Sequence, residues 1–202
     1  MPIIASTIGP LLIFSSIILG IILVLAIYII SVYNGFVKKR ASVRNDLRQI
    51  DIQLDRRFKV FESLISAVNK YMDHEKTTLK DVTALRKQAL AAKGNGDLAG
   101  QITAENQLST IAAGLQLQFE QYPDLKASNN VMQLQEEIVN TENKLSFAKQ
   151  AYNDGVERFN SARLVFPANI VANIFGDAFK PFDYWKLSDE DKQKKEEYVA
   201  KL

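Results

Sequence analysis

The chain has 202 residues, a formal net charge of +2, one histidine and no cysteine. This length allows one ordinary domain with an appendage, and the near balance of charge gives no indication of a nucleic-acid partner. The lack of cysteine excludes disulfides and thiolate metal sites. His74 alone cannot form a zinc site, which takes three or four ligands, so we expect no metal and no cofactor.

The N-terminus carries an apolar run that is long enough to span a membrane. Residues 1–37 contain no Asp, Glu, Lys or Arg, and residues 11–32 read LLIFSSIILGIILVLAIYIISV. About 20 apolar residues in a helix cross the roughly 30 Å hydrocarbon core of a bilayer. A cleaved signal peptide is the alternative, but it has basic residues before its apolar run. Here Lys38, Lys39 and Arg40 follow the run, which favours a retained single-pass anchor.

The basic residues after the anchor also predict its orientation. By the positive-inside rule the basic flank stays in the cytosol, so we expect a short N-terminus outside and the remaining chain inside. Residues 38–59 hold eight basic and three acidic side chains. Topology accounts for this excess, and recognition of anionic lipid stays open. The expected membrane-interface residues are the aromatic and basic ones that follow the anchor: Tyr33, Phe36, Lys38, Lys39, Arg40 and Arg44.

Four stretches after the anchor have helical periodicity. In 38–72 an apolar face recurs every three or four residues, and Arg57 is its polar exception. Further helices are expected from about residue 73 to the GNGD break at 94–97, from there to Tyr122 before Pro123, and over 130–165. Asn130 and Gln133 are expected to form a capping box. Whether the first two helices are continuous stays open.

These stretches predict the fold class. No strand signal with a period of two residues is found along the chain. We expect an all-α protein in which an N-terminal transmembrane helix continues into a cytosolic up-and-down four-helix bundle. The expected domains are the anchor (1–37), the bundle (38–165), and an aromatic segment with a short charged C-terminal helix (166–202).

Arg57 is expected to have an acidic partner, because an unpaired buried charge costs several kcal/mol. If the first and fourth helices of the bundle run antiparallel, Glu142 lies near Arg57 and Arg56. We therefore predict a contact of Glu142 with one of these two arginines. The alternative is that Arg57 reaches solvent from the edge of the apolar face.

Residues 166–185, FPANIVANIFGDAFKPFDYW, are crowded with aromatic side chains. If the fourth helix returns toward the bilayer, this segment emerges near the lipid headgroups. It could lie in the membrane interface, bind a neighbouring subunit, or fold back over the base of the bundle. The candidate partner or membrane contacts are Phe166, Phe175, Phe179, Phe182, Tyr184 and Trp185.

Several motifs resemble those of the bacterial LemA family: YPDLKA at 122–127, LQEE at 134–137, TEN at 141–143, YNDGVERFN at 152–160 and FP at 166–167. The resemblance covers nearly the whole chain to about residue 180, and residues 178–202 depart from the family pattern. It implies a single-pass membrane protein with a cytosolic helical bundle and no established enzymatic activity. The magnetosome-membrane protein MamQ is similar to this family, which favours membrane organisation. The YPDLKA stretch is then a helix–helix corner, with partner contact as the alternative.

These patterns predict a non-enzymatic, membrane-anchored scaffold or interaction protein that self-associates at the bacterial inner membrane. The alternative is a regulatory partner of another membrane protein, such as a protease or a sensor. An enzyme is least expected, because the chain has no P-loop, no G-x-G-x-x-G motif and no nucleophile elbow. The expected partners are the lipid bilayer, further copies of the chain and another membrane protein, without nucleic acid.

Overall fold

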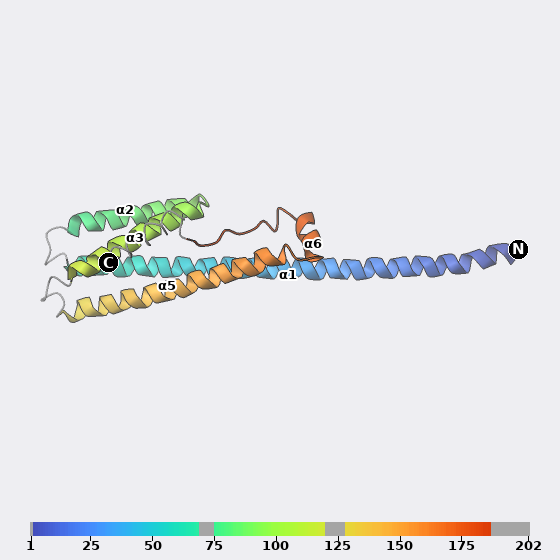
Figure 1. Cartoon of the computed structure of the whole chain (residues 1–202), viewed down its shortest axis with the longest axis horizontal. Helices are drawn as coiled ribbons and strands as arrows, with labels where there is room; N and C mark the ends of the chain where they lie inside the picture. The colour runs from blue at the N-terminus through green and yellow to red at the C-terminus, as the bar shows by residue number, and fades with distance from the viewer. Residues whose placement is uncertain (1, 69–74, 120–127, 187–202) are drawn as a thin grey trace, which may run out of the picture. The chain divides into compact units, whose positions relative to one another are not determined.

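The computed structural model describes residues 2–68, 75–119 and 128–186. Regular secondary structure in these ranges is entirely helical, without a strand. The helices are α1 (Pro2–Val68), α2 (Glu75–Gly94), α3 (Leu98–Phe119), α5 (Asn129–Ala162) and α6 (Ala168–Ile174) (Figure 1). The expected all-α fold, with a long apolar N-terminal helix followed by a helical bundle, is confirmed.

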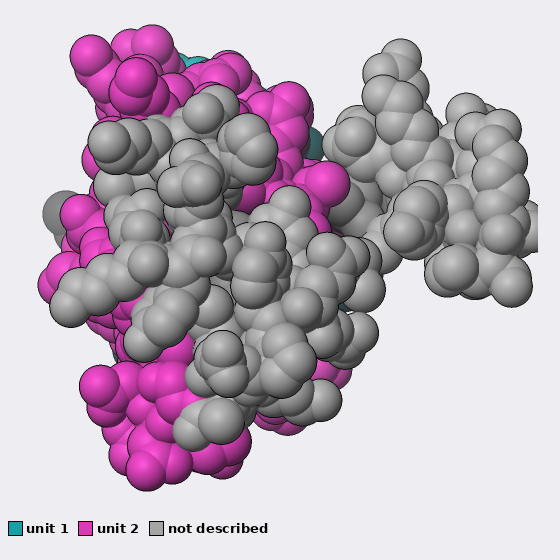
Figure 2. All heavy atoms as spheres, turned by 90° about the vertical axis from the view of Figure 1, so that its left-hand side faces the viewer, with its two compact units in different colours: residues 1–44, 155–182 teal, residues 45–154, 183–202 magenta. Residues whose placement is uncertain are grey.

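The chain divides into two compact units, which Figure 2 colours separately. Unit 1 comprises residues 1–44 and 155–182, and unit 2 comprises residues 45–154 and 183–202. These divisions differ from the expected domain boundaries at residues 37 and 165. The reason is that the end of α5 and the segment after α6 contact Tyr33 and Phe36 of α1, so they belong to unit 1 together.

Unit 2 is a bundle of four helical segments: residues 45–68 of α1, then α2, α3 and residues 129–154 of α5. Each segment runs opposite to the one before it (Figure 1). Buried side chains from all four segments meet in one core: Leu64, Ile65, Val82, Leu108 and Val131. The apolar faces that the sequence predicts are therefore the faces that the bundle buries, as the helical period requires.

The GNGD stretch ends α2 and starts α3, as expected. Gly96 has a φ of 72°, a left-handed conformation that glycine adopts without steric cost. The Asp97 N–H donates to the carbonyl oxygen of Ala92 at 2.9 Å. The Asp97 side chain accepts a hydrogen bond of 2.9 Å from the N–H of Gly100 and so caps the N-terminus of α3. This tight loop makes α2 and α3 antiparallel neighbours.

The start and end of α5 differ from the expected ones. The Met132 N–H donates to the Ser128 carbonyl oxygen at 3.0 Å, and α5 begins at Asn129 and ends at Ala162. Asn130 is already helical, so the capping box expected at Asn130 is wrong, because a capping residue has a non-helical backbone. The junction after the first helix, with His74, and the corner at Pro123 lie outside the described residues.

Candidate functional site

The first part of α1, in unit 1, carries the apolar stretch. An 18-residue window of this helix has a mean hydropathy of 2.9, and none of the window is buried. From Leu12 to Ile30 the large apolar side chains are 37–68% exposed. By length and composition α1 can cross a membrane.

Six aromatic side chains gather in unit 1 after this stretch, and we call them the aromatic cluster: Tyr33, Phe36, Phe159, Phe175, Phe179 and Phe182. The ring centroid of Phe179 lies 5.1 Å from that of Phe36 and 5.2 Å from that of Tyr33. Aromatic pairs at such distances contribute about 0.5–1.5 kcal/mol beyond their buried area. The cluster therefore holds residues 175–182 on α1 and on the end of α5.

Hydrogen bonds to the main chain fix the same segment. Arg40 Nη1 donates to the carbonyl oxygen of Ala178 at 2.9 Å. Asn160 Nδ2 donates to the carbonyl oxygen of Phe182 at 2.9 Å, and the Phe182 N–H donates to Asn160 Oδ1 at 3.1 Å. These contacts bind backbone atoms, so they set the position of the segment whatever its side chains are.

Five apolar side chains between residues 164 and 174 of unit 1 are more than half exposed. We call them the apolar ridge: Leu164, Val165, Phe166, Ile170 and Ile174, each 51–77% exposed. The opposite face of α6 is buried through Val171 and Ala172. Burying an exposed Leu, Ile or Phe side chain completely is favourable by about 1.5–3 kcal/mol. The ridge is therefore a surface on which contact with an apolar partner would be favourable.

The structure separates the predicted membrane-interface residues into two groups. Phe36 is buried, and Tyr33 and Arg40 are half-buried, because all three contact the segment of residues 175–179. The other three stay exposed: Lys38, Lys39 and Arg44. The aromatic residues thus face the protein, while most of the basic ones face outward.

The candidate contacts in residues 166–185 divide in a similar way. Phe166 is 75% exposed and Phe175 is 38% exposed. The remaining four are buried or half-buried: Phe179, Phe182, Tyr184 and Trp185. Most of this segment therefore covers other parts of its own chain. The ridge consists mainly of aliphatic residues, so the density of aromatic residues in the sequence does not indicate it.

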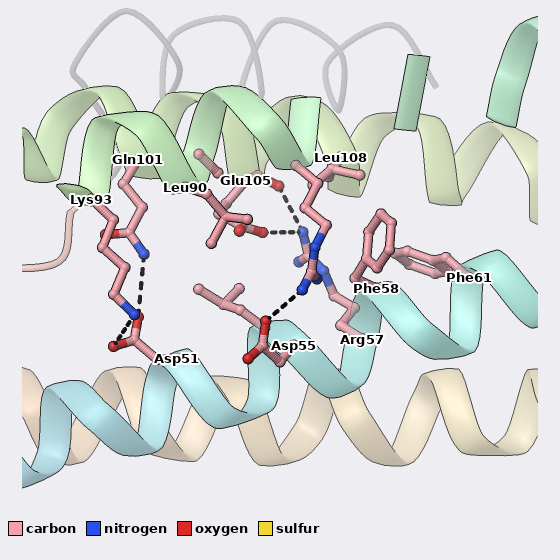
Figure 3. Close-up of a pocket in the computed structure, with 13 residues that line it drawn as sticks. Asp51, Asp55, Arg57, Phe58, Phe61, Leu90, Lys93, Gln101, Glu105 and Leu108 are labelled. Carbon is pink, nitrogen blue, oxygen red and sulfur yellow. Dashed lines mark hydrogen bonds and ion pairs between the residues drawn. The ribbon is translucent and has the colours of Figure 1, made fainter. Parts of the chain in front are cut away.

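In unit 2, Arg57 is only 1% exposed and lies at the centre of a polar network. Its Nη2 donates to Glu105 Oε2 at 2.8 Å and to the Glu105 carbonyl oxygen at 2.9 Å (Figure 3). Its Nη1 donates to Ser109 Oγ at 3.0 Å and lies 3.3 Å from Glu142 Oε1. The expected Arg57–Glu142 contact is present, but Glu105 is the closer partner. Arg57 is buried rather than reaching solvent.

Glu105 is the acidic residue that the sequence analysis missed. Burial raises the pKa of its carboxyl group, and the neighbouring Arg57 guanidinium opposes this rise. The spacing of the sequence indicates that Glu105 is buried: it follows Gln101 by four residues and precedes Leu108 by three, and both of these residues are buried. A carboxylate on the buried face of α3 needs a cation as much as Arg57 needs an anion.

A cavity of about 50 Å³ lies beside this network, among α1, α2 and α3 (Figure 3). Lys93 Nζ lies 2.8 Å from Asp51 Oδ2, and Gln101 Nε2 donates to Asp51 Oδ1 at 3.4 Å. Arg86 Nη2 donates to Asp55 Oδ1 at 2.8 Å.

The volume of the cavity limits what it can hold. A water molecule needs roughly 10–15 Å³, whereas small-molecule pockets measure roughly 300–1,000 Å³. The cavity has room for a few waters. Across the described ranges no group of three His, Cys, Asp or Glu side chains is placed to hold a metal ion.

Residues 183–186 of unit 2 lie along α5. Tyr152 donates its hydroxyl to the carbonyl oxygen of Asp183 at 2.8 Å. Asn153 Nδ2 donates to the Trp185 carbonyl oxygen at 3.0 Å, and the Trp185 N–H donates to Asn153 Oδ1 at 2.8 Å. Burial, with a smaller effect from Asp183, raises the pKa of Tyr152 to about 12, so this hydroxyl remains a donor at neutral pH. Asn153 thus binds the backbone of Trp185 as Asn160 binds that of Phe182 in unit 1.

Replacing Asn153 with alanine is expected to release Trp185 from α5. The change leaves the N–H and carbonyl groups of Trp185 without their partner, at a cost of about 1–3 kcal/mol. The chain has a single tryptophan, so its fluorescence reports this change directly. Emission should shift to longer wavelength and acrylamide should quench it more strongly. Asn140→Ala, at an exposed position of the same helix, is the control. An unchanged Trp185 spectrum in Asn153→Ala would contradict the prediction.

Comparison with known proteins places these features in a family context. The sequence model of the LemA family matches residues 46–199, which include α2, α3, α5 and α6. Protein LemA of Metamycoplasma hominis is 30% identical over 139 residues, which are 69% of this chain and 63% of that relative. The chain therefore spans less than two thirds of the relative's length.

Proposed function

Because the chain belongs to the LemA family, we propose that it is a membrane-anchored scaffold that associates with further copies of itself at the bacterial inner membrane. Family membership supports association with a membrane and names no reaction. The proposal therefore rests on what the two units can bind, and we treat the chain as a non-enzymatic protein.

In the proposed arrangement α1 crosses the inner membrane, with a short N-terminus outside and the bundle in the cytoplasm. The exposed apolar side chains between Leu12 and Ile30 support the crossing. The exposed Lys38 and Lys39, which follow this stretch, support the orientation, because basic flanks of transmembrane helices stay in the cytosol.

The interior of unit 2 supports a structural rather than a catalytic role. The charged groups around the cavity bind one another, as Arg57 binds Glu105 and Lys93 binds Asp51. A cavity of about 50 Å³ is far smaller than the pockets that hold metabolites. Charges that are paired within the protein hold helices in register, and they have little capacity left for a substrate.

The observation that carries self-association is an apolar line on the outer face of α5. Met132, Val139 and Phe147 are 44–70% exposed. Their spacings of seven and eight residues keep them on one side of a helix with 3.6 residues per turn. A second bundle that packs along this line would bury all three side chains, and Phe147 would contribute the largest area.

Crosslinking at Phe147 tests the scaffold. The chain has no cysteine, so Phe147→Cys introduces the only thiol. In native-like membranes a short bis-maleimide should link two copies through this position. Lys87→Cys, at an exposed position of α2, is the control and should link much less.

Two results would count against this function. Monomer alone after crosslinking, together with a monomeric mass in membrane nanodiscs, would contradict self-association. Capture of a different membrane protein through Phe147→Cys, without a homodimer, would favour the alternative role as a regulatory partner of a protease or a sensor.

A further inference from the structure

We propose that the apolar ridge is a second membrane contact, which rests in the headgroup layer of the bilayer beside the point where α1 leaves it. This inference rests on the proposed anchoring of α1 and adds a binding surface to it. The occupant of the surface is lipid. The side chains that would contact the lipid are Leu164, Val165, Phe166, Ile170 and Ile174.

The two faces of α6 differ in what they contact. Val171 and Ala172 are buried within unit 1, while Ile170 and Ile174 point outward and remain more than half exposed. Phe166, just before the helix, is 75% exposed. A short helix with apolar residues on its outer face is suited to lie in the plane of an interface, with that face a few ångströms below the headgroups.

Contacts within unit 1 place α6 at the right depth. Phe175, directly after α6, lies 4.9 Å from Tyr33 between ring centroids. Tyr33 follows the last residue of the apolar run, Val32. A helix of about 20 apolar residues ends at the boundary between hydrocarbon and headgroups, where tyrosine is enriched. The ridge therefore lies beside the same boundary.

Charge favours lipid over a second copy of the chain at this surface. Unit 1 has seven basic side chains and two acidic ones. Lys38, Lys39, Arg44 and Lys180 are exposed. Basic residues near an anionic leaflet attract its headgroups, whereas two copies joined at this surface would bring like charges together. The apolar ridge thus suits the apolar part of an anionic membrane, and the basic residues around it suit the negatively charged headgroups.

Depth-dependent quenching tests the proposal on the full chain. Ile170→Cys and Phe166→Cys place a fluorescent probe at exposed positions, so the core of unit 1 is left unchanged. The labelled protein is reconstituted as single copies in nanodiscs of anionic lipid that carry a nitroxide near the headgroup. Probes at both positions should be quenched several-fold more than a probe at Lys144→Cys, an exposed site in unit 2. Ser31→Cys in the apolar run is the positive control.

Equal quenching at Ile170 and Lys144 would overturn the proposal. So would disulfide formation between unlabelled Ile170→Cys copies in vesicles that hold many copies, if the single-copy sample shows no lipid quenching, because a second copy would then cover the ridge. Nanodiscs with a single copy make this test independent of the proposed self-association. If crosslinking through Phe147→Cys fails, the quenching result still tests the membrane contact of the ridge. Failure of quenching at Ser31→Cys as well would instead reject the membrane anchor itself.

Discussion

Replacing Arg57 with methionine is expected to lower the free energy of unfolding of unit 2 by about 3–5 kcal/mol at neutral pH. Methionine fills much of the apolar volume of the arginine stem. It leaves the Glu105 carboxylate, 10% exposed, without the guanidinium that lies 2.8 Å away. An isolated buried charge is more costly than the intact pair is stabilising, and for this reason the change is large.

Urea unfolding of the full chain in nanodiscs, followed by Trp185 fluorescence, measures this loss, because Trp185 is buried in the same unit. Arg56→Met is a control one residue away. Arg56 pairs with Glu137, but their side chains are 45% and 31% exposed, and exposed pairs contribute about 0.2–1 kcal/mol. If Arg57→Met loses no more stability than Arg56→Met, the network does not hold the bundle together.

The defect of Arg57→Met should also shrink as the pH falls. Burial raises the pKa of Glu105 above its ordinary value of 4.5, and loss of Arg57 removes an influence that lowers it. A carboxyl group whose pKa is higher in the folded state contributes stability at low pH, which is lost as the pH rises through the window above 4.5. The difference between Arg57→Met and the parent should therefore be smaller at about pH 5 than at about pH 7. An equal difference at both would contradict this assignment.

The polar network around Arg57 shows that a helical pattern can predict which side chain is buried, but not which side chain it contacts. The apolar face of α1 predicts that Arg57 is buried, and antiparallel helices predict Glu142 as a partner. The closer partner, Glu105, is on α3. The hydrophobic periodicity of one helix shows which side is buried, but it does not show which of the other three helices packs against a given side chain. The rotation and axial position of each helix come from side chains that interlock across all four segments, such as Leu64, Val82, Leu108 and Val131.

The packing of unit 1 is harder to predict from the sequence than that of unit 2. The apolar run and its basic flank predict a membrane anchor from composition alone. They do not predict that residues 175–182 return to α1, because an aromatic ring does not specify which ring it will pack against, and the remaining contacts, from Arg40 and Asn160, are made to backbone atoms. Backbone groups are the same at every residue, so such pairing leaves no pattern in the segment that is bound. The YNDGVERFN motif contains Asn153 and Asn160, which bind the backbone of Trp185 and Phe182 in the folded chain.

Replacing Phe179 with alanine is expected to detach residues 175–182 from α1. Phe179 is 1% exposed and contacts Tyr33, Phe36 and Phe175. Removing a buried Phe ring costs about 3–5 kcal/mol, the sum of lost transfer energy and an unfilled cavity. Since every 1.4 kcal/mol is tenfold in an equilibrium constant, local opening of this segment should become roughly a hundredfold to several thousandfold more frequent.

Hydrogen exchange of the anchored chain reads out this opening. The N–H groups of Ala178, residue 179 and Phe182 donate to Phe175, Gly176 and Asn160 in the parent, so they are protected there and should exchange faster in Phe179→Ala. Phe175→Ala removes a ring of the same cluster that is 38% exposed, and it should have a much smaller effect. If protection is lost equally in both variants, the cluster is not centred on Phe179. If it is kept in both, the backbone contacts of Arg40 and Asn160 hold the segment without the rings.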